Sequence, residues 1–91
     1  MIHVYQTPLF ARAKKKLHPW QINLLDIEIE NIRDNPTIGE VKRGDLSGVF
    51  VHKFKMKRDL YLLAYEYDHE SRTLIMLGSH ENFYRDLKQY H

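Results

Sequence analysis

The sequence predicts an α+β domain in which an N-terminal strand and a helical hairpin pack on a small, mostly antiparallel sheet that is followed by a C-terminal helix. Three observations predict this class. Apolar residues recur at helical spacing between residues 8 and 34, follow a two-residue period from 49 to 56 and form two further strand-like runs up to residue 77, and return to helical spacing after residue 81. With 91 residues the chain can build one modest core, so we expect a single domain over residues 1–91.

The first segment predicts a short strand followed by a helix. Residues 2–6, "IHVYQ", alternate apolar and polar side chains, as a half-buried strand does. Thr7 is a good N-cap and Pro8 suits the first helical position, so a helix should begin there. Its apolar residues share one arc of the wheel and basic residues fill the rest, the apolar set being Leu9, Phe10, Ala13 and Leu17.

A second helix is predicted from Trp20 to Asp34, between His18-Pro19 and Asn35-Pro36. It carries two apolar stripes on nearly opposite sides: Ile22, Leu25, Ile29 and Ile32 on one, and Trp20, Leu24 and Ile27 on the other. We expect the sheet to cover one stripe and the first helix to cover the other. An exposed partner site is the alternative.

The second half of the chain predicts a meander of three strands and a final helix. Residues 37–48 form a loop that can hold a short strand at 40–42. The next strand, "GVFVHKFKM", alternates Phe50, His52, Phe54 and Met56 with Val49, Val51, Lys53 and Lys55. "RDLYLLAYEY" and "RTLIML" are two further strands joined by a turn at 68–71, and a helix should run from about Glu81 to Tyr90, with Phe83 and Leu87 in the core.

Composition excludes several classes of function. The chain has no cysteine, which removes disulfides, thiolate catalysis and cysteine-based zinc sites. Its six histidines include no pair at helical spacing, and no glycine-rich phosphate loop is present, so we expect neither a metal site nor a cofactor. No apolar run is long enough to span a membrane, and the N-terminus does not resemble a signal peptide; we therefore expect a cytoplasmic protein without membrane contact.

The net charge of +2 conceals a basic segment. Residues 41–58 contain six basic side chains and only one acidic one, Asp45; the basic set is Lys42, Arg43, Lys53, Lys55, Lys57 and Arg58. Such a segment predicts a face that binds a polyanion, although a solvated strand face is the alternative. For RNA binding we single out Lys42, Arg43, His52, Lys57, Arg58 and Arg85, although a buried, hydrogen-bonded role is the default for His52, which shares parity with Phe50 and Phe54.

Four residues form a candidate catalytic set. Lys53 and Lys55 point to the same side of one strand and can bind an anion, while His80 follows Gly78 at the end of the last strand and Tyr84 lies one helical turn later. An imidazole, whose ordinary pKa is about 6.5, can exchange a proton at neutral pH. A proton donor or acceptor together with fixed cations suits RNA cleavage, in which the 2′-hydroxyl attacks the phosphorus. Capping for His80 and a solvated face for the lysines are the structural alternatives.

The segments "GDLSGVFVHKFKM", "LYLLAYEY" and "LIMLGSHENFYRDLK" resemble the RelE/ParE superfamily of small bacterial toxins. The resemblance implies a RelE-like fold, a cognate antitoxin that forms a hetero-oligomer with the chain, and, for RelE-like branches, cleavage of messenger RNA in the ribosome. It assigns Lys53 and Lys55 as the strand cations, His80 as the proton-transfer residue after the glycine, and Tyr84 or Phe83 as the C-terminal aromatic.

The resemblance leaves alternatives open. Leu62 stands where RelE has an arginine, so Arg58 or Arg85 has to supply that charge. ParE-type members inhibit DNA gyrase without cleaving RNA, and a plain nucleic-acid-binding domain is a third possibility. Convergence of His80, Lys53 and Lys55 favours the ribonuclease. We expect an antitoxin segment to cover the Lys53/Lys55 face or to displace the terminal helix.

Overall fold

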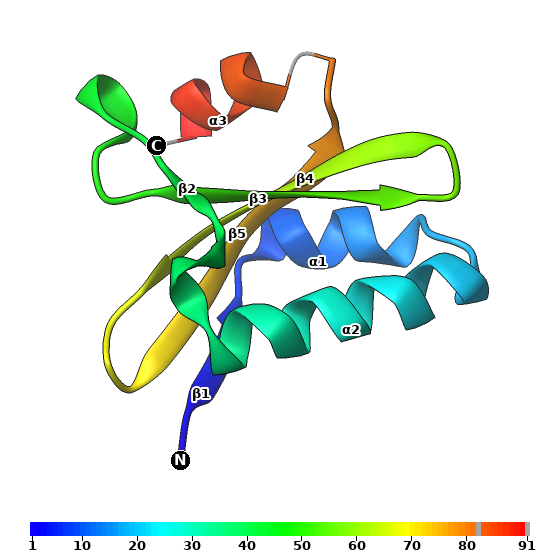
Figure 1. The fold of residues 1–91 in the computed structure, drawn as a ribbon. Coiled ribbons are helices and arrows are strands. Elements are labelled where there is room, and N and C mark those ends of the chain that lie inside the picture. The colour runs from blue at the N-terminus through cyan, green and yellow to red at the C-terminus, as the bar shows by residue number, and fades with distance from the viewer. Residues whose placement is uncertain (82, 91) are drawn as a thin grey trace.

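Two helices cover one face of a five-stranded sheet, and a third helix lies on the other face (Figure 1). The computed structural model describes residues 1–81 and 83–90. The strands are β1 (His3–Gln6), β2 (Glu40–Val41), β3 (Phe50–Met56), β4 (Asp59–Tyr67) and β5 (Ser71–Ser79). The helices are α1 (Pro8–Lys15), α2 (Pro19–Asp34) and α3 (Phe83–Tyr90), with 3₁₀ turns η1 (Pro36–Ile38) and η2 (Gly44–Leu46).

The sheet has the order β1-β5-β4-β3-β2. Strands β3, β4 and β5 form the antiparallel meander that the sequence predicts, and β2 adds antiparallel to β3. Strand β1 runs parallel to β5, with His3 opposite Ser71. The predicted α+β class, with a hairpin on one face and a C-terminal helix, is therefore confirmed, and β5 extends two residues beyond the predicted run, to Ser79.

Thr7 links the start of α1 to the sheet. Its Oγ1 accepts a hydrogen bond from the Phe10 N–H at 3.1 Å, as an N-cap does, and donates one to the Ile75 carbonyl at 2.6 Å. At the turn between the helices, the Gln21 side chain accepts from the His18 N–H at 2.8 Å. Local capping signals thus fix both helix starts, and Thr7 fixes the position of α1 relative to β5.

Each face of the sheet has its own core. The core under the hairpin contains Phe10, Leu25, Ile32, Phe54, Met56, Leu63, Tyr65, Leu74 and Leu77. The core under α3 contains Leu46, Val49, Val51, Leu62, Ala64, Ile75, Met76, Phe83 and Leu87. The predicted alternation along β3 and the predicted core role of Phe83 and Leu87 are confirmed.

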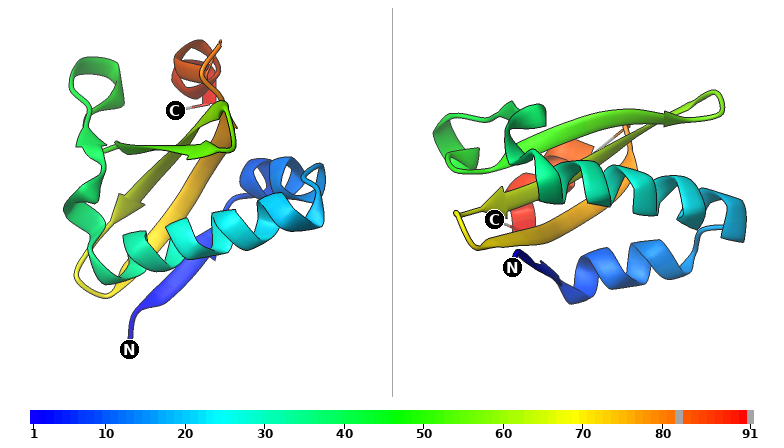
Figure 2. Two further views of the ribbon diagram at one scale, coloured as in Figure 1. Left: turned by 45° about the vertical axis from the view of Figure 1, so that its right-hand side comes forward. Right: turned by 60° about the horizontal axis from the view of Figure 1, so that its bottom comes forward.

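The outer stripe of α2 is exposed, so the expectation that α1 covers it is wrong. Trp20 and Leu24 are each 37% exposed and Ile27 is 52% exposed. Helix α1 lies beside α2 in the same layer (Figure 2), where Ala13 and Leu17 pack against the core under the hairpin. A helix in a single layer on a sheet buries only its inner side, which leaves the opposite stripe in solvent.

Arg72 fastens the end of α2 to the turn between β4 and β5. Its side chain is buried; Nε lies 3.3 Å from the Ile32 carbonyl and 3.2 Å from the Arg33 carbonyl, and Nη1 donates to the Asp68 and Ser71 carbonyls at 2.7 and 3.0 Å. A cation at the carboxyl end of a helix is favourable because it satisfies free carbonyls and opposes the helix dipole.

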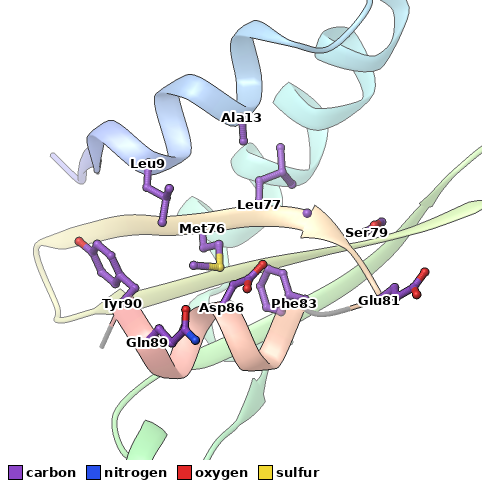
Figure 3. A pocket seen from close by; sticks show the side chains of 11 residues that line it. Leu9, Ala13, Met76, Leu77, Ser79, Glu81, Phe83, Asp86, Gln89 and Tyr90 are labelled. Atoms are coloured by element: carbon purple, nitrogen blue, oxygen red, sulfur yellow. The ribbon is translucent and has the colours of Figure 1, made fainter.

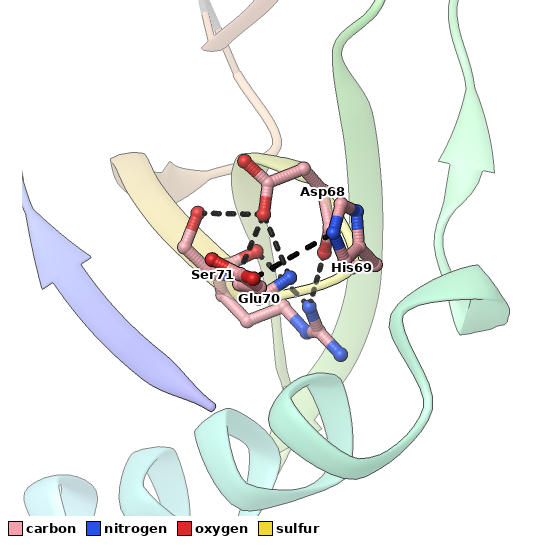
Figure 4. Close-up of polar contacts among 5 residues, drawn as sticks. Asp68, His69, Glu70 and Ser71 are labelled. Atoms are coloured by element: carbon pink, nitrogen blue, oxygen red, sulfur yellow. Dashed lines mark hydrogen bonds and ion pairs between the residues drawn. The ribbon is translucent and has the colours of Figure 1, made fainter. Parts of the chain in front are cut away.

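The same turn is closed by the Asp68 carboxylate. Oδ1 of Asp68 accepts from the backbone N–H groups of Glu70 and Ser71 at 2.8 Å each and from the Ser71 hydroxyl at 3.1 Å (Figure 4). The N–H of Glu70, followed by the Ser71 groups, lowers the pKa of the Asp68 carboxyl below its ordinary value. The turn is therefore held from within by Asp68 and from α2 by Arg72.

Residues 1–81 and 83–90 lack two kinds of feature. None of the helices there combines the length and the apolar character that a bilayer crossing requires. The same residues contain no group of three histidine or carboxylate side chains placed to hold a metal ion.

Candidate functional site

The face of the sheet that carries α3 also carries the predicted catalytic cations. Lys53 lies opposite Leu62, and Leu62 lies opposite Gly78, so β3, β4 and β5 form a row in which the backbones of Lys53 and Gly78 are roughly 10 Å apart. Strand alternation carries Lys55 to the same side as Lys53, and His80 lies directly beyond the end of β5, two residues after Gly78. All three side chains are exposed. The structure therefore places the two lysines on one face and His80 just past the end of the strand that holds Gly78.

The floor between these polar groups is apolar. Leu62 is fully buried in the middle of the row. At Gly78, an added Cβ would stand 3.4 Å from Cδ1 of Phe83, which shows how closely α3 approaches the end of β5. A substrate phosphate between Lys53 and His80 would lie above Leu62, so its charge must be balanced by side chains from the neighbouring strands.

Glu40 is the main residue that the sequence analysis missed. Glu40 lies on β2, opposite Val51 of β3. Its Oε1 accepts a hydrogen bond from Lys42 Nζ at 3.0 Å, and its Oε2 lies 4.0 Å from Lys53 Nζ. The hydrogen bond from Lys42, followed by the charges of Lys42 and Lys53, lowers the pKa of the Glu40 carboxyl. An ionised carboxylate thus bridges two ammonium groups. One feature of the sequence could have indicated this contact: Glu40 and Lys42 are two residues apart in the predicted strand at 40–42, so their side chains point to the same face.

Tyr84 closes the group on the α3 side. Its ring packs against the core under α3, and Lys42 Nζ stands 4.7 Å from the ring centroid. Burial is the largest single influence and lowers the pKa of Lys42, but Glu40 and Tyr84 together outweigh it, so the pKa of Lys42 is raised. Among the described residues, the buried Tyr84 hydroxyl has no hydrogen-bond partner. We call Glu40, Lys42, Lys53 and Tyr84 the Glu40 cluster.

The predicted RNA-binding residues do not all share this face. His52 points to the hairpin side, where its Nε2 lies 2.7 Å from Oε1 of Glu28 on α2. Lys57 Nζ stands 4.2 Å from the centroid of the Trp20 ring, also on α2. The structure therefore separates His52 and Lys57 from the Glu40 cluster, and it places His52 in the hydrogen-bonded role that is its default.

The three predicted arginines are exposed. Arg43 follows Lys42, Arg58 lies in the turn between β3 and β4, and Arg85 lies on α3 with its Nε 3.8 Å from Oδ1 of Asp86. Within the Glu40 cluster, the cation that contacts the Tyr84 ring is Lys42; it is neither Arg58 nor Arg85.

Tyr65 anchors the loop that delivers Glu40. It is fully buried, its hydroxyl donates to the Pro36 carbonyl at 2.6 Å, and it accepts from the Gly39 N–H at 3.0 Å. A Cβ on Gly39 would approach the Tyr65 hydroxyl oxygen to 2.5 Å, so a glycine is required for this contact. Burial raises the pKa of the Tyr65 phenol, although the Gly39 N–H opposes the shift. The phenol therefore stays neutral and can keep both hydrogen bonds.

Replacing Tyr65 with phenylalanine should lower the free energy of unfolding by about 1–3 kcal/mol, since it leaves the buried Pro36 and Gly39 backbone groups without a partner. Urea titration followed by circular dichroism measures the change. Tyr5→Phe, at a phenol that is 55% exposed, is the matched control and should be neutral. Equal stability of the two variants would contradict an anchoring role for Tyr65.

Comparison with known proteins identifies relatives of this fold. The model of a family described as ParE-like toxin of type II bacterial toxin-antitoxin system matches residues 4–88. Among curated proteins, none matches the chain. The RelBE2 toxin-antitoxin complex of Mycobacterium tuberculosis contains a similar chain, with a TM-score of 0.72 and 21% identity over 86% of this chain and 96% of that one.

Two further solved structures are similar. A chain of the intact E. coli RelBE toxin-antitoxin complex has a TM-score of 0.70 and 18% identity over 89% of this chain and 99% of that one. The YoeB/ParE toxin of Agrobacterium tumefaciens has a TM-score of 0.70 and 14% identity over 87% and 99%. At these identities the three structures establish a shared fold, and the chemistry has to be argued from the site itself.

Proposed function

Since the chain belongs to the family of ParE-like toxins of type II bacterial toxin-antitoxin systems, we propose that it is a ribosome-dependent endoribonuclease that cleaves messenger RNA by metal-independent acid–base chemistry. One observation carries the proposal: Lys53 and Lys55 share a face of the sheet with an ionised carboxylate, Glu40, that is held between two ammonium groups, and His80 follows the end of β5 two residues after Gly78, which lies in the same row of strands as Lys53. Inhibition of a protein target by surface contact does not require such a set.

The reaction assigns a step to each group. Glu40, a carboxylate that is ionised at neutral pH and whose pKa Lys42 lowers further, accepts the proton of the ribose 2′-hydroxyl. The 2′-oxygen attacks the phosphorus, the bond from phosphorus to the 5′-oxygen breaks, and the protonated His80 imidazole donates a proton to the departing oxygen. The products are a 2′,3′-cyclic phosphate and a 5′-hydroxyl. Lys42, Lys53 and Lys55 offset the charge that develops on the phosphorane.

The exposed arginines extend this site toward the substrate. Arg43, Arg58 and Arg85 can contact phosphates of the messenger or of ribosomal RNA, and such contacts add affinity without reading sequence. The antitoxin is the second partner, and an acidic or amphipathic segment over Lys53 and Lys55 would neutralise the toxin by occluding its anion site.

The alternative is a toxin that inhibits DNA gyrase by protein contact. The exposed stripe of Trp20, Leu24 and Ile27 favours it, since such an apolar surface can bind a protein. The purified chain should be added to ribosomes programmed with a defined messenger and, in parallel, to a gyrase supercoiling assay. We expect cleavage that leaves a cyclic phosphate and a 5′-hydroxyl. Inhibition of supercoiling without cleavage, or salt-dependent RNA binding without cleavage, would overturn the ribonuclease proposal.

Tyr84 provides a test of the Glu40 cluster. Tyr84→Phe keeps the ring beneath Lys42 and should leave the cleavage rate near that of the parent chain. Tyr84→Ala removes the cation–π contact and should lower the rate by about 2- to 30-fold, the equivalent of roughly 0.5–2 kcal/mol. Single-turnover kinetics on programmed ribosomes measure both variants, with unfolding curves to exclude a loss of folded protein. An equal loss in both variants would show that the hydroxyl acts in the reaction.

A further inference from the structure

A groove of about 490 Å³ runs beside β5 between α1 and α3 (Figure 3). Consecutive residues Met76, Leu77, Gly78 and Ser79 all line it. Because successive side chains of a strand point to opposite faces of the sheet, four neighbours can share one groove only if it lies along the edge of the strand. The groove therefore follows the edge of β5, on the side away from β4.

This edge of β5 has no strand partner among the described residues. Strand β1 pairs with β5 only as far as Leu74, and Thr7 makes the last contact, at the Ile75 carbonyl. Beyond that point the chain turns into α1. In an antiparallel pair, alternate residues direct their N–H and C=O groups away from the partner strand. The stretch from Met76 to Ser79 therefore presents backbone donors and acceptors to the groove, as an edge open to strand addition does.

The walls of the groove decide what can bind there. Leu9 and Ala13 of α1 line one side, and Phe83 and Tyr90 of α3 line the other. A single extended segment fits between two helices. Alternate side chains of an added strand would face the α1 wall and the α3 wall, while its backbone would hydrogen-bond to the edge of β5.

The charge of the groove defines the segment further. Glu81 and Asp86 line it, and no basic residue is among its lining residues, although Arg85 lies 3.8 Å from Asp86 and the chain as a whole has a net charge of +2. An acidic groove on a basic protein favours a segment with basic side chains. The volume lies in the range of sites that hold small ligands and short peptide segments.

We propose that the β5 edge binds an extended segment of the antitoxin, with alternating apolar and basic residues, as an added strand in line with β1. The inference rests on membership of the toxin family and does not depend on RNA cleavage. It predicts a second contact in addition to the occlusion of Lys53 and Lys55. Because α3 forms one wall, a segment bound here would hold α3 in place rather than displace it.

The experiment uses the full chain, labelled with ¹⁵N, and a blocked synthetic peptide of sequence Val-Lys-Val-Lys-Val as the probe. We expect saturable binding and slower hydrogen exchange of backbone amides between Met76 and Ser79. The double variant Glu81→Gln/Asp86→Asn should bind about 2- to 30-fold more weakly, as two exposed ion pairs allow. The matched control, Glu30→Gln/Glu66→Gln, removes the same charge away from the groove and should bind as the parent chain does.

Two further peptides sharpen the test. Val-Glu-Val-Glu-Val should bind more weakly than the lysine peptide. N-methylation of alternate residues of the lysine peptide removes the backbone donors on one edge of the strand, and in one of the two methylation registers it should abolish binding. Absence of binding at millimolar peptide, or protection confined to β2 or α2, would overturn the proposal. None of these measurements involves RNA, so a failure of cleavage leaves this result unaffected.

Discussion

Replacing His80 with alanine should lower the rate of messenger RNA cleavage on programmed ribosomes by about 100-fold or more, the usual contribution of a positioned proton donor. The 5′-oxygen is a poor leaving group unless it receives a proton, and in the proposed reaction His80 supplies it. The side chain is exposed, so the substitution should leave the fold intact. Single-turnover cleavage, followed by primer extension, measures the rate separately from ribosome binding.

Two other histidines serve as controls for this experiment. His69 lies in the turn before β5, and its side chain is 91% exposed, whereas His80 follows the other end of β5. His69→Ala should therefore keep the parent rate. His52→Ala should also keep the chemical rate, because His52 contacts Glu28 on the opposite face, although it can lower stability. An unchanged rate in His80→Ala would remove His80 from the mechanism.

The faces of the sheet were predictable because strand alternation is a local property. The two-residue period between 49 and 56 assigns Phe54 and Lys53 to opposite sides before any contact is known, and the structure places them so. The N-cap at Thr7 is also local, since its hydroxyl bonds to an N–H three residues later. Signals of this kind need no knowledge of which segments meet.

The Glu40 cluster was not predictable in the same way. It depends on a two-residue strand, β2, whose position comes from the hydrogen bonds that Tyr65 makes across the sequence to Pro36 and Gly39. No periodicity marks such a contact. The prediction that α1 would cover the second apolar stripe of α2 failed for a related reason. A helical wheel shows two apolar sides, but only the arrangement of layers shows that α1 lies beside α2 and leaves Ile27 in solvent.

Arg72 illustrates how one long-range contact supports the site. Its guanidinium joins the carbonyls of Ile32 and Arg33, at the end of α2, to those of Asp68 and Ser71 in the turn before β5. The chain leaves α2 two residues before η1 and reaches Glu40 directly afterwards. Fixing the end of α2 therefore fixes the start of the loop that Tyr65 holds at its other end.

Arg72→Met should lower the free energy of unfolding by about 3 kcal/mol or more, because methionine keeps the apolar stem but leaves buried carbonyls without a donor. For a domain of this size, that corresponds to a fall of roughly 12–24 °C in the unfolding midpoint. Arg12→Met, at an exposed position of α1, is the matched control and should be nearly neutral. Thermal unfolding measured by circular dichroism compares the two variants. If the position of Glu40 depends on this loop, Arg72→Met that is folded at low temperature should also cleave RNA more slowly than Arg12→Met does. Equal stability of the two variants would show that the four carbonyls find other partners. Equal cleavage rates would show that the end of α2 does not position Glu40.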